Sequence, residues 1–242
     1  MLGKFPKYDG YSWGDVYLDA EGTQKVEGTE IAHSGKINFD NATAENASMK
    51  LYVDYMEGQW FYITSAKQLT NSASVSGNYI LGADLDFEGL IWPTAFMHGN
   101  FTGTIVGNGH KIYNVELTQT NNSKVNTGLF GQLTEKASIN DVTFENITLT
   151  IQGGTRVTGA SFGLLAGTVS DKAQIGNVAI DGKLQIAADA YFGTDDYVIG
   201  LLCGTGSLTM DDSGITCTLI GENTQGITVT VENGKVTLGI QE

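Results

Sequence analysis

The chain has 242 residues, 27 of them acidic and 13 basic, which gives a formal net charge of −14 and a pI near 4.4. A chain this acidic repels phosphate backbones, which excludes non-specific nucleic-acid binding, and a hydrophobic content of 41 % excludes a disordered chain. Glycine is abundant (32 residues) and proline scarce (2 residues) without a Gly-X-Y period, so the chain is not a collagen and its glycines are expected in turns and close backbone approaches.

The longest apolar runs, such as VIGLLC at 198–203, fall far short of the roughly 18 residues of a membrane-spanning helix. We therefore expect no membrane insertion. The opening MLGKFPKYDG has no apolar core and does not form a signal peptide. The chain is either cytosolic or a secreted protein whose leader is absent from this sequence, and the resemblance described below favours the second.

The first 62 residues differ in pattern from the rest. Short alternating stretches with Glu-Gly turns fill 14–40, and MKLYVDY and QWFYI, joined by residues 56–59, predict a β-hairpin. We interpret 1–62 as an N-terminal β segment, either packed on the main domain or part of a preceding one.

Residues 63–242 are predicted to form one repetitive β domain. Its only helical pattern is TSAKQLTNSA at 64–73, which Thr64 or Ser65 can cap. Gly-Leu pairs then begin at 128, 163 and 200, at intervals of 35 and 37 residues. Self-similarity at such a period indicates a solenoid of short strands.

The predicted fold is therefore all-β, with coils that stack because no single coil can bury its apolar face. Inward side chains should form ladders along the axis: Leu129, Leu164 and Leu201; Ile139 and Ile175; Val142 and Val178. Glycine suits the corners, and proline is scarce because backbone N–H groups donate to neighbouring coils. Two alternating stretches around Asn233-Gly234, at 226–240, predict a C-terminal hairpin that caps the open end.

The two cysteines, Cys203 and Cys217, have no metal-ligand spacing. Cys203 stands where Ala166 stands one coil earlier, which is typical of a small buried side chain. We interpret both as buried free thiols, with a disulfide between neighbouring turns as the alternative.

Residues 79–178 carry several motifs in a fixed order: YILGADLDFEG, IWPTAF, FTGTIVGNGHKIYNVEL, GLFGQL and ASINDV. Together they resemble the GLUG-repeat family. The resemblance implies a right-handed parallel β-helix from a secreted or surface-anchored bacterial protein, a group that includes adhesin-like proteins and the non-catalytic regions of immunoglobulin A peptidases. Thr94-Ala95 and Val106-Gly107 depart from the family's Ile-Gly and Asp-Gly steps, and the first sixty residues do not match it.

The sequence offers no catalytic constellation, so the chain is predicted not to be an enzyme. Its three histidines, His33, His98 and His110, form no HExxH zinc motif, and the single arginine, Arg156, gives a uronate lyase little positive charge. His110 lies in a Gly-Asn-Gly-His turn, where we expect its ring to tie a corner to a backbone carbonyl rather than to act in catalysis.

Asp84, Asp86 and Glu88 alternate along a predicted strand and can point to one face. We interpret the two aspartates as strand-end hydrogen-bond acceptors. The alternatives are a calcium site, which would be the only cofactor, and an acid–base pair.

The segment AADAYFGTDDY at 187–197 interrupts the repeat, and insertions in solenoids often lie on the binding face. Its rings and carboxylates suit a sugar or a protein partner, and these residues form our candidate ligand-binding loop: Tyr191, Phe192, Asp195, Asp196 and Tyr197. The alternative is that the rings cover the flank of the solenoid.

These observations predict a non-catalytic, secreted or cell-surface bacterial β-helix module, part of a larger surface protein, that acts in adhesion or ligand binding. The expected partner is a glycan or a protein on a host or neighbouring cell. The alternatives are a β-helix enzyme acting on polysaccharides and a purely structural spacer.

Overall fold

The computed structural model describes residues 11–17, 23, 52–120, 125–152, 161–187, 198–200, 202–206, 215–221, 227–232 and 235–240. The chain divides into two compact units, Met1–Tyr62 and Ile63–Glu242. In the first unit, β1 (Tyr11–Tyr17) and β2 (Tyr52–Glu57) pair antiparallel.

The predicted hairpin between MKLYVDY and QWFYI is wrong. β2 pairs with β1, whereas β3 (Trp60–Ile63) belongs to a different sheet. The side chain of Ile63 is fully buried, and its carbonyl accepts a hydrogen bond from the N–H of Gly82 (2.9 Å). The alternating pattern predicts both strands correctly but does not specify which strands they pair with. Burial of Ile63 in the core of the second unit favours placing β3 in the sheet that contains β4.

The second unit contains two short helices. α1 (Ala66–Ser72) confirms the helix predicted over 64–73, and the side chain of Ser65 caps it by accepting a hydrogen bond from the N–H of Gln68. α2 (Thr94–His98) was not predicted. Among the described residues, no helix is long and apolar enough to cross a membrane.

The described strands that follow β2 form three sheets, one of eight strands and two of four strands each. The first has the order β16-β13-β10-β7-β4-β3, with β8 paired to β10 and β5 to β8. Its strands after β3 are β4 (Asn78–Leu81), β5 (Leu85–Asp86), β7 (Thr104–Val106), β8 (Lys111–Thr120), β10 (Ser138–Gln152), β13 (Gln174–Ile186) and β16 (Ile215–Gly221). The second, in the order β15-β12-β9-β6, contains β6 (Asn100–Phe101), β9 (Phe130–Leu133), β12 (Ala166–Val169) and β15 (Cys203–Thr205).

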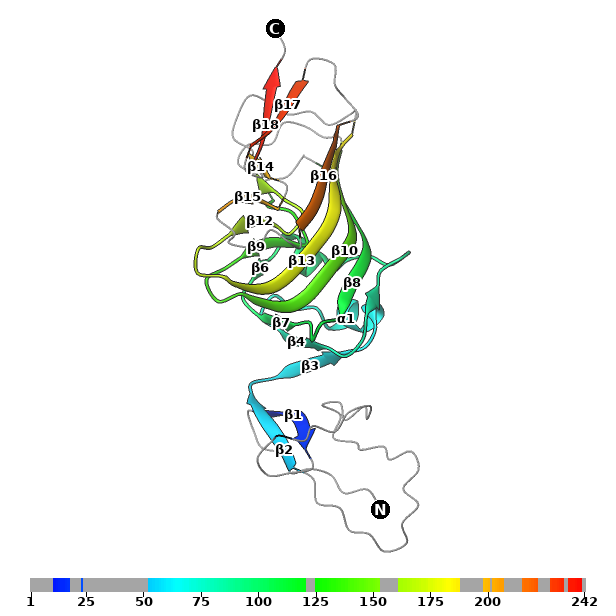
Figure 1. Cartoon of the computed structure of the whole chain (residues 1–242), viewed down its shortest axis with the longest axis vertical. Coiled ribbons are helices and arrows are strands. Elements are labelled where there is room, and N and C mark those ends of the chain that lie inside the picture. Colours follow the sequence, from blue (N-terminus) through cyan, green and yellow to red (C-terminus); the bar gives the residue numbers. More distant parts are fainter. Residues whose placement is uncertain are drawn as a thin grey trace, which may run out of the picture. The chain divides into compact units, whose positions relative to one another are not determined.

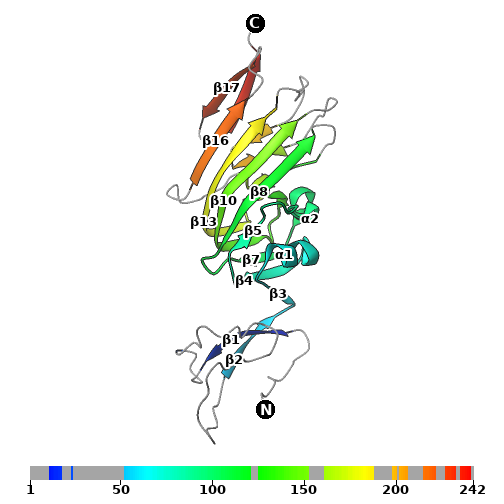
Figure 2. The same ribbon diagram turned by 90° about the vertical axis from the view of Figure 1, so that its right-hand side faces the viewer.

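The pairings β5-β8, β8-β10, β10-β13 and β13-β16 are all parallel, as are those that link β6, β9, β12 and β15. β8, β10, β13 and β16 lie side by side and curl strongly, so that their sheet forms half of a barrel (Figures 1 and 2). The chain is thus mostly β with parallel sheets, which confirms that part of the predicted fold class.

The stacking predicted for Ile139 and Val142 with the residues 36 positions later is present. Ile139 is aligned with Ile175, and Val142 with Val178. Leu129 and Leu164 are fully buried, and the N–H of Leu129 donates to the carbonyl of Leu164 (2.9 Å), whereas Leu201 lies outside the described residues.

Cys203 is aligned with Ala166, as the repeat comparison predicts. It is a free thiol, but half-buried rather than buried as expected, and this burial raises its pKa. The side chain of Cys217 lies outside the described residues.

The core fills the space between the first two sheets, that of β10 and that of β9. The ring of Phe130 on β9 meets that of Phe144 on β10 edge to face, with centroids 6.5 Å apart, and stands 5.0 Å from the ring of Phe101 on β6. Aromatic side chains therefore join the sheets at this level of the stack.

A third sheet has the order β11-β14-β18-β17, with β11 (Ser161–Phe162) and β14 (Val198–Gly200). β17 (Ile227–Glu232) and β18 (Lys235–Ile240) pair antiparallel from Ile227 opposite Ile240 to Glu232 opposite Lys235, which confirms the C-terminal hairpin. Its role as a cap stays a prediction.

Candidate functional site

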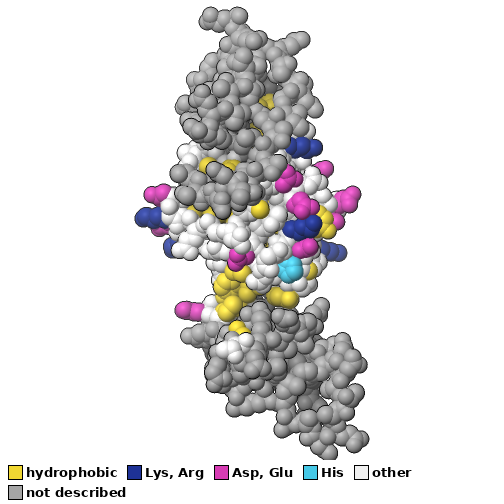
Figure 3. Space-filling view, in the orientation of Figure 1, with side chains coloured by type: hydrophobic (Ala, Val, Ile, Leu, Met, Phe, Trp, Pro, Cys, Tyr) yellow, Lys and Arg dark blue, Asp and Glu magenta, His cyan; other side chains and the backbone are white. Residues whose placement is uncertain are grey.

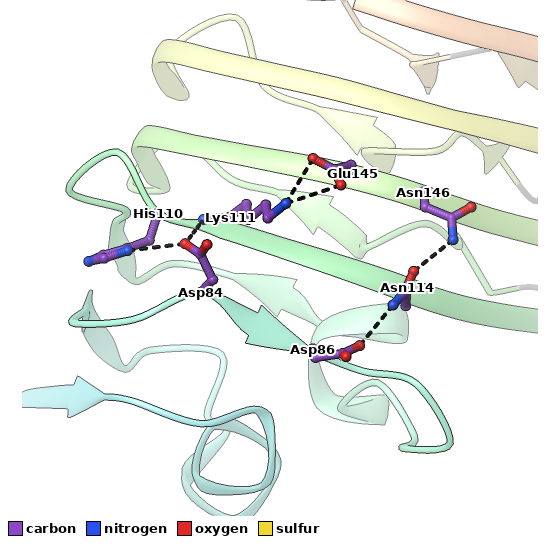
Figure 4. Close-up of polar contacts among 7 residues, drawn as sticks. All are labelled: Asp84, Asp86, His110, Lys111, Asn114, Glu145 and Asn146. Atoms are coloured by element: carbon purple, nitrogen blue, oxygen red, sulfur yellow. Dashed lines mark hydrogen bonds and ion pairs between the residues drawn. The ribbon is translucent and has the colours of Figure 1, made fainter.

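Charged and polar side chains gather on one flank of the second unit, where acidic, basic and histidine side chains lie together (Figure 3). Strands β5, β8 and β10 and the residues just before them carry this polar patch. Figure 4 shows its members: Asp84, Asp86, His110, Lys111, Asn114, Glu145 and Asn146.

Asp84 ties the residues before β5 to the start of β8. Its Oδ1 lies 3.1 Å from Nδ1 of His110 and accepts a hydrogen bond from the N–H of Lys111 (3.1 Å). The Lys111 N–H above all, with His110 beside it, lowers the pKa of Asp84. The predicted partner of His110 was a backbone carbonyl; the structure gives its ring a carboxylate, which performs the same corner-tying role.

Asp86, Asn114 and Asn146 form a hydrogen-bonded ladder across three strands (Figure 4). Oδ1 of Asp86 accepts from the N–H of Glu88 and from Nδ2 of Asn114, both at 2.9 Å, and these bonds lower the pKa of Asp86. Nδ2 of Asn146 in turn donates to Oδ1 of Asn114 (2.7 Å). Asn114 and Asn146 have φ of 58° and 52°, a left-handed conformation that asparagine tolerates better than most residues.

Lys111 completes the patch on its outer face. Its Nζ donates to both carboxylate oxygens of Glu145, at 3.2 and 3.3 Å, and lies 4.9 Å from the ring centroid of Tyr113. All three side chains are partly exposed, so this ion pair and cation–π contact contribute little to stability.

The patch has the geometry of a structural network. Each of its side chains bonds to a neighbour in the stack, which agrees with the strand-end role expected for Asp84 and Asp86. Within the part of the chain that the structure describes, no three His, Cys, Asp or Glu side chains are grouped so that they could hold a metal ion. The calcium site and the acid–base pair stay predictions.

A second surface feature is the segment 87–92 between β5 and α2, which we call the apolar loop. Leu90 is 40 % exposed and Ile91 78 %, whereas Phe87 and Trp92 at its ends are each 1 % exposed. Nε1 of Trp92 donates to the buried carbonyl of Leu129 (2.8 Å), so Trp92 is anchored in the core.

Sequence reasoning missed the exposure of the apolar loop. Leu90 and Ile91 stand between two core aromatic residues in the string FEGLIW, and apolar residues in such a string are assigned to the core. The usable signal is Gly89, whose φ of +70° marks a turn that carries the chain away from the core before Trp92 returns to it.

The candidate ligand-binding loop predicted from the sequence lies outside the described residues, with Tyr191, Phe192, Asp195, Asp196 and Tyr197. It follows β13 in the chain. Its role stays a prediction.

These features define a mostly β region of parallel sheets whose described polar patch is a hydrogen-bonded network. A family model described as the M26 IgA1-specific metallo-endopeptidase N-terminal region matches residues 39–182, more than half of the chain. The chain therefore belongs to this family. The match confirms the part of the resemblance that concerns immunoglobulin A peptidases, whereas the GLUG repeat stays a prediction.

The matched region begins within the first unit, where the repeat resemblance found nothing, and ends within β13. The IgA1 proteases that give the family its name are secreted or surface proteins of bacteria. No curated protein matches the chain. No solved structure matches it either.

Proposed function

We propose that the chain is a non-catalytic, right-handed parallel β-helix module of a secreted or cell-surface bacterial IgA1 protease, and that it binds a glycan or a host protein on behalf of the larger enzyme. The family match over 39–182 carries this proposal. The parallel alignment of β10 with β13 and of β13 with β16 supports the β-helix, because stacked coils produce such alignments.

The non-catalytic part of the proposal is supported by the polar patch. An acid–base pair needs carboxyl groups that can reach a substrate, with pKa values moved toward the working pH. The bonds of Asp84 and Asp86 lower their pKa values instead, and one oxygen of each carboxylate is held by two donors from neighbouring residues.

The binding part is supported by the scaffold and the charge. Stacked strands hold surface loops in fixed positions, which suits the recognition of a partner. A net charge of −14 favours a neutral or basic partner over a polyanion. Because the family is named for IgA1, immunoglobulin A1 is the first host protein to test.

The test measures binding and turnover together, with the full 242-residue chain on a glycan array and on immobilised immunoglobulin A1. We expect saturable binding to a member of one panel and intact ligands after incubation. Turnover of a glycan that is lost in Asp84→Asn, Asp86→Asn or Asp196→Asn would contradict the proposal and identify a polysaccharide-active enzyme. Absence of binding to both panels would leave the chain a structural spacer.

A further inference from the structure

We propose that the apolar loop, 87–92, is a docking site for another protein chain, and that the docked segment carries apolar side chains beside a lysine or arginine. This inference rests on the proposed binding function and gives it a surface and a partner of defined chemistry.

The first argument is where the exposed apolar surface lies. Among the large hydrophobic side chains that the structure describes, Leu90 and Ile91 are the exposed ones, and they are neighbours. Single exposed apolar residues are common on any protein and need no explanation. Two adjacent ones, where the other large apolar side chains that the structure describes are covered or partly covered, form an exposed apolar surface.

The second argument is that the loop is closed at its base. The rings of Phe87 and Trp92 lie 5.0 Å apart and are buried, and the indole N–H of Trp92 is held by the carbonyl of Leu129. These rings already fill the core beneath the loop. Leu90 and Ile91 therefore have no buried position to occupy, and their exposure is built into the fold.

The third argument is that the backbone is held in place between its anchors (Figure 2 shows α1, α2 and β5 around it). The N–H of Glu88 donates to Asp86, and the N–H of Leu90 donates to the carbonyl of Phe87 (2.8 Å). The hydroxyl of Thr70 on α1 lies 3.4 Å from the carbonyl of Ile91 and shares its proton with the nearer carbonyl of Ala66 (3.1 Å). A preorganised loop loses little conformational entropy when a partner binds, which is the usual property of an interface anchor.

The fourth argument is charge. The carboxylate of Glu88 makes no hydrogen bond or ion pair with any residue that the structure describes, and Asp86 precedes it on the same exposed edge. An apolar pair next to an unneutralised carboxylate is complementary to apolar side chains next to a cation. The same charge disfavours a second copy of this chain, whose net charge is −14.

The aliphatic character of the loop separates a protein partner from a glycan. Sugars are recognised by aromatic rings and by polar groups around them. Leu90 and Ile91 offer neither, whereas aliphatic side chains pack well against those of a polypeptide.

The experiment uses three immobilised twelve-residue peptides and the full chain. One peptide carries Leu-Phe-Ile between lysines, the second carries the same core between glutamates, and the third replaces the core with serines between lysines. We expect the wild-type chain to bind the first at least about tenfold more tightly than either of the others. The double variant Leu90→Asn/Ile91→Asn should lose that preference, and Glu88→Lys should shift it toward the glutamate peptide.

Glu116→Lys is the matched control, because Glu116 is also an exposed glutamate and lies on β8, and it should bind like the wild type. Urea unfolding checks that each variant is folded, which we expect because the substituted side chains are exposed. The docking site is overturned if the double variant binds the first peptide as well as the wild type does. It is also overturned if the double variant changes self-association in sedimentation, which would make a second copy the occupant. If the wild-type chain binds no peptide yet binds immunoglobulin A1 or a glycan, this site fails while the proposed function stands.

Discussion

The inward and outward side chains of the same strands are organised by different physical rules. On the inward side, Leu85, Ile112, Phe144 and Ile180 are aligned from β5 to β13 and are at most 1 % exposed. On the outward side, Asn114 bonds to Asp86, and Asn146 bonds to Asn114. These three side chains are exposed or partly exposed to solvent. Burial holds the first set together, and hydrogen-bond geometry with a left-handed backbone holds the second.

A register shift between β10 and β13 affects the inward and outward side chains differently. Phe144 is opposite Ile180 while Ile147 is opposite Gly182, so two residues of β10 face one of β13. The polar ladder ends there, because β13 has no residue in the place of Asn146. The apolar alignment resumes with Leu149 opposite Leu184, both fully buried. The row of buried apolar side chains thus continues past the missing residue of β13, whereas the ladder of side-chain hydrogen bonds stops there.

The largest expected effect on stability comes from removing a buried side chain on the inward side. Phe144→Ala removes a fully buried ring that packs on Phe130, and we expect a loss of about 3–5 kcal/mol in the free energy of unfolding. Urea unfolding followed by circular dichroism measures it. Thr143→Ala, on the partly exposed side of the same strand, is the control and should change stability by less than about 0.5 kcal/mol. Equal losses in the two variants would remove the distinction between the faces.

The next effect tests how closely the coils approach each other. A Cβ at Gly103 would collide with the backbone carbonyl of Gly77 in the adjacent coil, so Gly103→Ala must push the backbones apart. We expect a loss of about 1–3 kcal/mol in unfolding free energy. At Gly176 a Cβ would meet only the side chain of Asn140, which can move aside. Gly176→Ala should therefore be milder, and a reversed order would show that coil spacing is not what glycine provides.

Breaking the hydrogen-bonded ladder on the outward side is expected to lower the unfolding free energy by less. Asn146→Ala loses the bond to Asn114 and places alanine at a φ of 52°, for a combined cost of about 1–2 kcal/mol. Asn146→Gly loses the same bond but accepts that backbone conformation, so it separates the two contributions. Thermal and urea unfolding of both variants give the difference. If alanine and glycine cost the same, the left-handed conformation is not a determinant of the ladder.

The sequence predicts the inward face better than the outward one. The interval of 36 residues was enough to align Ile139 with Ile175 and Val142 with Val178, because apolar residues that recur at a fixed period must share one core. Nothing comparable identifies Asn114 and Asn146 as a pair. Their spacing is set by a coil of a different length, and an asparagine in a strand-like string carries no sign of positive φ.

Of the two candidate sites on the described surface, the polar patch was partly predicted from the sequence and the apolar loop was not. Asp84 and Asp86 were predicted as hydrogen-bond acceptors because carboxylates at a strand end satisfy backbone donors, and the structure gives them such donors. The apolar loop was missed because composition assigns Leu90 and Ile91 to the core. Only three-dimensional packing shows that Phe87 and Trp92 have already filled it.

The smallest expected effect concerns the dependence of stability on pH. The pKa of Asp84 is lowered in the folded chain, chiefly by the N–H of Lys111 and further by His110, so the unfolded chain binds the proton more tightly. The stabilisation that results is fully present above the unfolded pKa of about 4 and is lost as the pH falls through the folded value. In Asp84→Asn the unfolding free energy should therefore fall less steeply than in the wild type when the pH drops below about 4.

Asp181→Asn is the matched control, since Asp181 is an exposed aspartate of β13 with no hydrogen-bond partner among the described residues. It should keep the wild-type slope. Urea midpoints measured between about pH 2 and 7 for the three proteins compare them directly. If the slope of Asp84→Asn equals that of the wild type, the bond from Asp84 to the start of β8 does not persist in solution. Between β5 and β8, the outward face would then depend on the hydrogen bond from Asn114 to Asp86, together with the buried side chains on the inward side.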